Sequence, residues 1–181
     1  MSELKWIETA RKLIGLLAED PRKGYTIKKI PEMWDFVNAK IGQTQRLKEK
    51  VWDTDDTAWC GLFVAYVLAQ HEDLVKHIPI AYPVARSWAN AGTKLKKPAY
   101  GSIAVFSRGK GMGHVGFVVG EDKAGNLMIL GGNQSNKVSI APISKARLLC
   151  CVWCGTQKLP SETRYKLNAI SHSMKVSTNE A

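Results

Sequence analysis

The stretch that decides the fold of this chain is WCGLFVAYVLAQ, residues 59–70. It is apolar almost throughout, and a helix with apolar residues on every side has to be buried nearly all round. Asp55, Asp56 and Thr57 come just before it and carry the oxygen atoms that cap helix N-termini. With Thr57 as the cap, we predict a central buried helix with Cys60 in its first turn.

Helical spacing of apolar residues also marks the N-terminal part of the chain. Residues 2–18 predict a first helix, which ends before Pro21. A second helix is predicted to start near Pro31 and to run to Ile41, with a polar continuation toward Lys50. A shorter helical piece is expected over residues 84–91.

From Ser102 onward the pattern changes to short β-rich runs separated by Gly-rich or polar breaks. The predicted strands cover residues 102–107, 114–120, 126–130, 137–140 and 147–153. Helices followed by an antiparallel meander of about five strands indicate an α+β fold rather than a doubly wound sheet. We expect a single domain: residues 1–50 form a helical extension packed on the core, 51–158 the core itself, and 159–181 a polar tail, either weakly helical or loose.

The length and charge of the chain bound the possible functions. A chain of 181 residues suits one domain with a substantial core, and 26 Lys and Arg against 16 Asp and Glu would attract polyanions. The basic residues between Gly92 and Lys110 could form a basic rim, but a solvated face is the simpler explanation. We expect no nucleic-acid partner, no membrane-spanning segment and a monomer.

Three of the four cysteines, Cys150, Cys151 and Cys154, crowd together near the end of the last predicted strand. No second Cys/His pair lies at zinc-finger spacing, so we expect buried thiols, no metal site, no cofactor and no disulfide framework. The start of the chain, MSELKWIE, lacks the basic and then apolar pattern of a secretory signal. We therefore expect synthesis in the cytoplasm, with any export by another route.

Cys60 and His114 are the candidate reactive pair. The positive end of a helix dipole favours a thiolate, but an isolated cysteine on an apolar helix would ordinarily be a core residue. His114 lies at the mouth of a strand between Gly113 and Gly116, which leave space around the imidazole. The other three histidines have no comparable surroundings.

A hairpin argument adds a third group. If residues 114–120 and 126–130 pair symmetrically about Lys123, His114 lies opposite Gly132, and Asn133 is one residue away. An amide beside an imidazole can fix the tautomer that faces a cysteine. The same alternation predicts that the face with Gly116 and Val118, opposite Phe117, is the one that the Cys60 helix approaches.

Four ordered motifs together resemble the NlpC/P60 and CHAP superfamily of papain-like peptidoglycan hydrolases. The motifs are WCGLFV at residues 59–64, PAYGSIAVF at 98–106, GHVG at 113–116 and GGNQ at 131–134. The resemblance implies a papain-like fold, with Cys60 as nucleophile, His114 as general base and Asn133 as the polar orienter. Many members carry an acidic third residue where this chain has Gly131, so Gln134 is the alternative orienter.

The resemblance also implies a substrate and a setting. Family members cut amide bonds in peptidoglycan, as endopeptidases or amidases, and we expect Trp59, Gln134 and Arg86 to bind substrate. Arg86 would hold a stem-peptide carboxylate, although a structural ion pair is the simpler interpretation. The branch suggests a phage endolysin or an injected antibacterial effector, acting in the periplasm or cell wall. A cognate immunity protein or secretion machinery would then be a partner.

Two other functions fit the same residues. A Cys-His-Asn site would also serve a protease or deamidase toxin that acts on a host protein. A catalytically silent, basic wall-binding module would bind without product, and its binding would survive the loss of Cys60.

Overall fold

The computed structural model describes residues 2–17, 19–20, 25–26, 29–43, 59–172 and 175–177. The α-helices are α1 (Lys5–Arg11), α2 (Lys29–Ile41) and α3 (Cys60–Ala69), and the 3-10 helices are η2 (Glu72–His77), η3 (Ala85–Asn90), η4 (Lys145–Arg147) and η5 (Glu162–Tyr165). The strands are β1 (Glu19–Asp20), β2 (Tyr25–Thr26), β3 (Thr93–Leu95), β4 (Ile103–Ser107), β5 (Gly113–Glu121), β6 (Leu127–Gly131), β7 (Ser139–Ile143) and β8 (Leu148–Trp153). The fold is α+β, as predicted, and consistent with a papain-like architecture.

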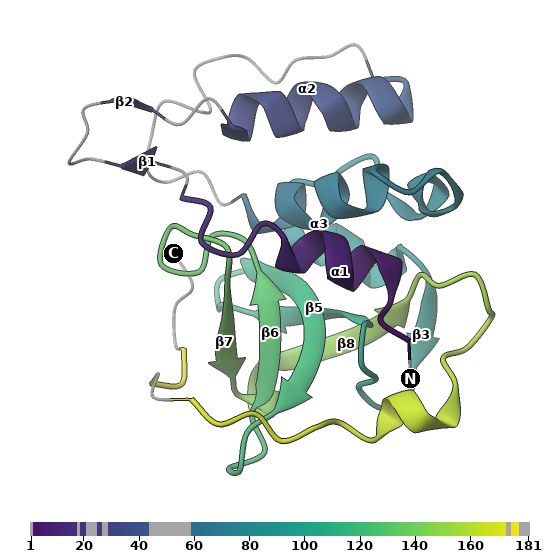
Figure 1. Ribbon diagram of the computed structural model, residues 1–181, viewed down its shortest axis with the longest axis vertical. Helices are drawn as coiled ribbons and strands as arrows, with labels where there is room; N and C mark the ends of the chain where they lie inside the picture. Colours follow the sequence, from purple (N-terminus) through teal and green to yellow (C-terminus); the bar gives the residue numbers. More distant parts are fainter. Residues whose placement is uncertain are drawn as a thin grey trace.

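Six strands form one antiparallel sheet in the order β3-β8-β4-β5-β6-β7. Figure 1 shows α1 and α3 beside this sheet and α2 on the far side of α3. The prediction of about five strands missed β3, a three-residue edge strand with Lys94 at its centre. Such a short run has no apolar alternation to mark it, and a central lysine is typical of an exposed edge.

Helix α3 is buried as predicted, with Tyr66 its single partly exposed residue. The helix starts at Cys60 with Trp59 as N-cap, and the predicted cap, Thr57, lies outside the described residues. Gly61 allows a loop to pack against this helix start, because a Cβ there would lie 2.1 Å from the carbonyl oxygen of Tyr82. None of the described helices has both the length and the apolar character that a membrane crossing requires.

The second predicted helix is confirmed as α2, which starts two residues before Pro31. It packs on the far side of α3 from the sheet, where the rings of Trp34 and Tyr82 lie 5.0 Å apart. The predicted continuation toward Lys50 falls outside the described residues, since description stops at residue 43. The shorter predicted piece at residues 84–91 is the 3-10 helix η3.

The first helix is shorter than predicted. It ends at Arg11, and Gly15 has φ +91°, a left-handed conformation that an α-helix cannot contain. The chain then pairs with a distant segment: Gly15 donates to the Val138 carbonyl at 2.9 Å, and a β-bridge joins Leu17 to Lys137. Tertiary pairing therefore replaces the last helical turns. It also explains why β7 starts at Ser139 and not at the predicted residue 137.

The β5–β6 hairpin forms as predicted, but its register was wrong by two residues near the turn, where Gly120 pairs with Met128, and by one residue farther along. Phe117 pairs with Leu130, whereas symmetry about Lys123 predicted Ile129. An irregularity between Val118 and Gly120 adds one residue to β5. A bulge of this kind changes the pairing of every residue beyond it.

The prediction of which β5 face receives the Cys60 helix was also wrong. Val115 and Phe117 belong to the large core cluster that contains α3, and the rings of Phe63 and Phe117 lie 6.2 Å apart. Val118 packs in a second cluster with Phe106 on β4. The large apolar residues of β5 therefore face the helix, because burying them stabilises the fold more than close approach over glycine does.

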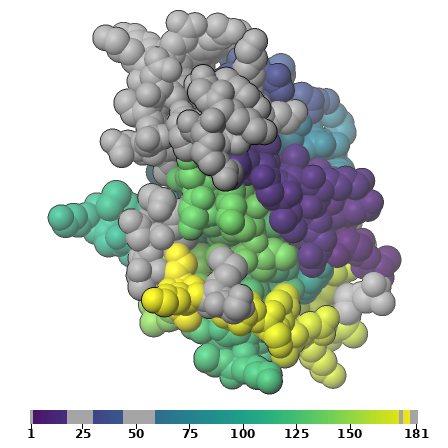
Figure 2. Space-filling model, turned by 60° about the vertical axis from the view of Figure 1, so that its left-hand side comes forward, coloured from purple at the N-terminus to yellow at the C-terminus, as the bar shows by residue number. Residues whose placement is uncertain are grey.

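The C-terminal segment is attached to the sheet and is not a loose tail over its described residues. The Glu121 N–H donates to the Asn168 carbonyl at 3.0 Å, and the Ile170 N–H donates to the Glu121 carbonyl at 2.8 Å. Farther on, the Ser177 N–H donates to the Pro142 carbonyl at 2.9 Å. Figure 2 shows the yellow C-terminal residues lying against the green strands.

Candidate active site

Strands β5 and β6 separate at one end of the sheet. β5 pairs with β4 from Gly113, but its pairing with β6 starts only at Phe117. Residues 113–116 therefore have no ladder partner on the β6 side, although Gly116 still lies against Leu130 and Gly131. We call this opening the β5–β6 split. The start of α3 lies against it, because a Cβ on Gly132 would come within 2.5 Å of Phe63 and 2.6 Å of Trp59.

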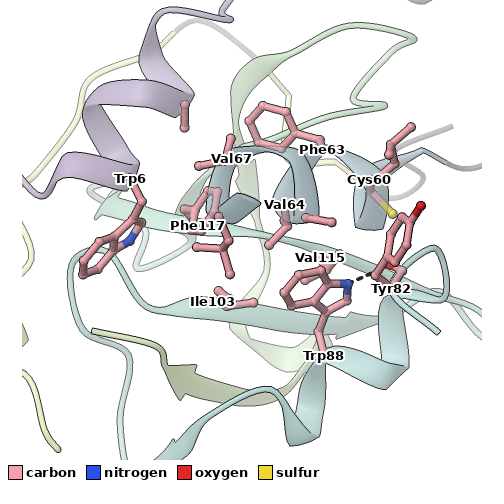
Figure 3. Packing of buried hydrophobic residues seen from close by; sticks show 14 of the residues in the cluster. Trp6, Cys60, Phe63, Val64, Val67, Tyr82, Trp88, Ile103, Val115 and Phe117 are labelled. Atoms are coloured by element: carbon pink, nitrogen blue, oxygen red, sulfur yellow. Dashed lines mark hydrogen bonds between the residues drawn. The ribbon is translucent and has the colours of Figure 1, made fainter. Parts of the chain in front are cut away.

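Cys60 lies at the split. It is the first residue of α3 and is 1% exposed, and Figure 3 shows it at the helix end near Val115. The backbone N–H of Val115 hydrogen-bonds to the thiol. In an antiparallel strand successive N–H groups point to opposite neighbours, and Val118 N–H donates to Ser102 on the β4 side. The Val115 N–H therefore points to the β6 side, into the opening that the thiol occupies.

Burial raises the pKa of the Cys60 thiol above its ordinary value. The backbone N–H groups of Val115 and Gly61 and the positive charge of Arg108 act in the opposite direction, but burial is the largest cause. The backbone N–H groups at the helix start favour the thiolate, as predicted, but burial opposes them and is the larger effect. A base is needed to remove its proton.

His114 is wholly buried and directly precedes the residue that contacts the thiol. Its Nε2 lies 3.3 Å from Oε1 of Gln134, across the split. Gly131 provides the space for this contact, because a Cβ there would lie 3.2 Å from both the imidazole Nε2 and the Gln134 amide. A side chain at position 131 would thus occupy the space that the Gln134 amide fills in this chain.

The orientation of the Gln134 amide follows from its other contacts. Its Nε2 lies within 3.3 Å of four acceptors: the carbonyls of Ile129, Gly131 and Ser139 and the hydroxyl of Ser139. Carbonyl oxygens only accept, so this end of the amide is the NH₂ group and the oxygen faces His114. An amide oxygen facing Nε2 makes Nε2 the protonated nitrogen of the neutral ring, and the lone pair then lies on Nδ1.

Asn133 is buried beside this contact, but the hydrogen bond from the imidazole goes to Gln134. Asn133, Ser135 and Asn136 all have positive φ, between 53° and 58°. This turn directs the Gln134 side chain inward. The backbone N–H of Gln134 donates to the Lys137 carbonyl at 3.0 Å.

Arg86 lies beside Gly113, and Trp59 directly precedes Cys60. Arg86 is exposed on η3, with its Cγ 3.2 Å from where a Cβ on Gly113 would lie. Its guanidinium donates to the carbonyl of Met112 at 3.1 Å and to the hydroxyl of Ser107 at 3.3 Å, and among the described residues no acidic group pairs with it. Trp59 is 3% exposed, and in the described part of the chain its indole N–H finds no hydrogen-bond partner.

Two residues of the site were missed by the sequence analysis. Arg108 had been counted only as part of the basic stretch, and Ser139 had been given no role. Neither lies in a motif, and their contribution depends on pairing in space: the β4–β5 hairpin brings Arg108 near the thiol, and β7 brings Ser139 beside Gln134. Elsewhere in the described ranges, no three His, Cys, Asp or Glu side chains gather as a metal site.

The comparison with protein families agrees with this geometry. Residues 52–133 match the family model of the CHAP domain, which belongs to the NlpC/P60 and CHAP cysteine peptidase superfamily. This segment of the chain is similar to the CHAP domain. No curated protein and no solved structure matches the chain. The CHAP match includes Cys60, His114 and Asn133 and ends one residue before Gln134.

CHAP domains are generally hydrolases, and the match suggests an amidase or peptidase that acts on peptidoglycan. The resemblance stated from the four motifs is thereby confirmed. The residues outside the match, at 1–51 and 134–181, supply Gln134, Ser139 and the N-terminal segment that pairs near them. Some of the residues around the His114 imidazole therefore lie outside the segment that matches the CHAP model.

Proposed function

We propose that this protein is a cysteine hydrolase that cuts amide bonds of bacterial peptidoglycan. Cys60 is the nucleophile and His114 the general base. The observation that carries the proposal is the hydrogen bond between Gln134 and Nε2 of His114, at the split where the Cys60 thiol lies. That bond leaves Nδ1 as the basic nitrogen of the ring, as proton removal from a thiol requires.

Because burial raises the pKa of the Cys60 thiol, the thiol has to lose its proton to a base as the sulfur attacks. His114 removes the thiol proton through Nδ1 as the sulfur attacks the carbonyl carbon of the scissile amide. The tetrahedral intermediate then loses the amine, which takes the proton from the imidazolium. Water, deprotonated by the same imidazole, hydrolyses the thioester and regenerates the thiol.

The oxyanion needs hydrogen-bond donors near the sulfur. The Cys60 backbone N–H is one candidate, because it lies at the start of α3 and has no partner within that helix. The second donor that we expected in the turn before Trp59 lies mostly outside the described residues.

Gln134 is the orienter that we propose, with Asn133 placing it through its left-handed backbone. The amide position, the four contacts of its NH₂ group and the absence of a side chain on Gly131 all support this assignment. Arg86 and Trp59 remain the proposed substrate contacts. Arg86 is exposed beside the split, and its partners among the described residues are neutral oxygen atoms, so its charge can attract a stem-peptide carboxylate.

Peptidoglycan lies outside the cytoplasm, so the protein must be exported or injected to act on it. We propose the setting of an antibacterial effector or lysin. As an effector it would have a cognate immunity protein, which would have to block the β5–β6 split. Co-purification of an encoded neighbour that inhibits wall digestion would support this setting.

The test compares wild-type protein, Cys60→Ala and Cys154→Ala on purified peptidoglycan, with released fragments identified by mass spectrometry. Cys154 is a matched control, because it is also a buried free thiol but lies away from the split. We expect release by the wild type and by Cys154→Ala and none by Cys60→Ala. Equal release by all three proteins would refute the proposal, and the masses of the fragments identify the bond that is cut.

A further inference from the structure

The N-terminal segment reaches the far side of the split. Val138 forms two backbone hydrogen bonds with it: Gly15 N–H donates to the Val138 carbonyl at 2.9 Å, and Val138 N–H donates to the Leu16 carbonyl at 2.8 Å. A β-bridge between Leu17 and Lys137 continues the pairing. We call residues 15–17 the clamp. It adds a short strand beside the chain that follows the Gln134 turn.

The other end of this N-terminal region is anchored in the core. Trp6 and Ile7 of α1 are buried, and the Trp6 indole N–H donates to the Gly101 carbonyl at 2.9 Å. The clamp is therefore a fixed support for Val138.

Val138 adjoins the residue that holds Gln134. The Ser139 carbonyl accepts from Gln134 Nε2 at 2.6 Å, the shortest of the four contacts, and its hydroxyl lies at 3.2 Å. Ser139 pairs with Gly131, so β6 supports Ser139 from one side. The residue before Ser139 is Val138, which the clamp holds. A shift of Ser139 would move the acceptor that keeps the Gln134 oxygen turned toward His114.

The turn between β6 and β7 needs such support. Three non-glycine residues in it, Asn133, Ser135 and Asn136, have left-handed backbone conformations, which cost free energy. A turn of this kind persists only when its surroundings hold it. Directly after the turn, the clamp supplies two hydrogen bonds to Val138 and a β-bridge to Lys137.

We propose that the clamp is a positioning element of the catalytic site. It holds Val138 and Ser139, which hold the Gln134 amide, which in turn sets the ring orientation and tautomer of His114. The clamp lies outside the CHAP match, so a segment beyond the shared domain completes the site. Its effect on turnover rests on the proposed function, whereas its effect on the imidazole does not.

The test uses Gly15→Pro in the full chain, with Gly42→Pro as the matched control. Both glycines have positive φ and open space around an added Cβ, but only Gly15 donates to Val138. Proline removes the N–H and cannot adopt φ +91°. Nitrogen-15 NMR of labelled histidine reports the tautomer of His114, and wall digestion reports kcat and KM.

We expect the wild type and Gly42→Pro to show a single Nε2-protonated tautomer of His114. Gly15→Pro should show a mixture of both tautomers and a kcat lower by about fivefold with unchanged KM, because fewer molecules hold the productive ring. A single Nε2-protonated tautomer in Gly15→Pro, together with fast exchange of the Val138 amide, would overturn the proposal.

Two further comparisons keep the test decisive. If Gly15→Pro does not fold, Gly15→Ala against Gly42→Ala strains the same backbone positions more mildly, and the same tautomer difference, smaller in size, is expected. Identical His114 spectra in that pair would overturn the proposal. If the wild type digests no wall, the proposed function fails, while the NMR comparison still decides the role of the clamp.

Discussion

The two ends of strand β5 each hold a histidine, and they are built differently. At its start, Nε2 of the wholly buried His114 lies 3.3 Å from the neutral amide oxygen of Gln134. Just past its end, Nε2 of His172 lies 3.1 Å from a carboxylate oxygen of Asp122. The Gln134 contact orients a ring inside the core, whereas the Asp122 contact joins the C-terminal segment to the β5–β6 turn. The His114–Gln134 contact suits proton transfer, and the His172–Asp122 contact suits attachment of the C-terminal segment.

The largest difference should come from removing each imidazole in turn. His114→Gln should lower kcat/KM for wall digestion by on the order of 10²- to 10⁴-fold, the usual contribution of a general base. His172→Gln should leave it within about twofold, because His172 lies at the opposite end of β5, away from the split. Rates of fragment release measure both. Comparable losses in the two variants would remove the functional distinction between the two ends.

A smaller effect should separate the two candidate orienters. Gln134→Leu removes the amide but keeps an apolar side chain, and should lower kcat roughly tenfold, about the worth of one hydrogen bond. Asn133→Gly removes the amide side chain, and glycine adopts the same φ of +54° without strain. We expect it to retain nearly full activity. A larger loss for Asn133→Gly than for Gln134→Leu would assign the orienter to Asn133.

The smallest effect should be on the pH dependence of stability at the Asp122 end. The side chain of Asn126, then the backbone N–H groups of Asn126 and Ala124 and the ring of His172, lower the pKa of Asp122 from 3.8 to about 2. The unfolded chain keeps the ordinary value, so this stabilisation is complete above about pH 4 and is lost as the pH falls toward 2.

Asp122→Asn should therefore melt below the wild type at pH 7, and the gap should narrow between pH 4 and pH 2. Wall digestion at pH 7 should be unchanged. A Tm gap that stays constant across this range would show that the carboxylate charge does not fasten the segment. Loss of digestion would show that the two ends of β5 are coupled.

Much of this arrangement could be predicted from local sequence, because local chemistry determines it. Residues 59–70 are too apolar to lie anywhere but in the core, and short β-rich runs between Gly-rich or polar breaks mark β4, β5, β6 and β8. Cys60 and His114 were likewise predicted, since each lies in a short motif at the start of one of these elements.

The contacts of the imidazole could not be predicted in the same way. The register of the hairpin depends on a bulge between Val118 and Gly120, which alternation does not reveal. The inward direction of Gln134 depends on left-handed backbone at Asn133 and Ser135, and non-glycine residues rarely adopt it. The end of the first helix depends on pairing across more than a hundred residues, for which a local periodicity carries no signal.

The central claim is that Cys60 forms a covalent bond with the substrate after His114 removes its proton. The most direct measurement mixes the full-length protein with soluble peptidoglycan fragments, quenches in acid within milliseconds to seconds, and maps the protein by mass spectrometry. We expect an acyl adduct on the peptide that contains Cys60 in the wild type and none in His114→Gln. Fragment release by Cys60→Ala at the wild-type rate, with no adduct in either protein, would contradict the account.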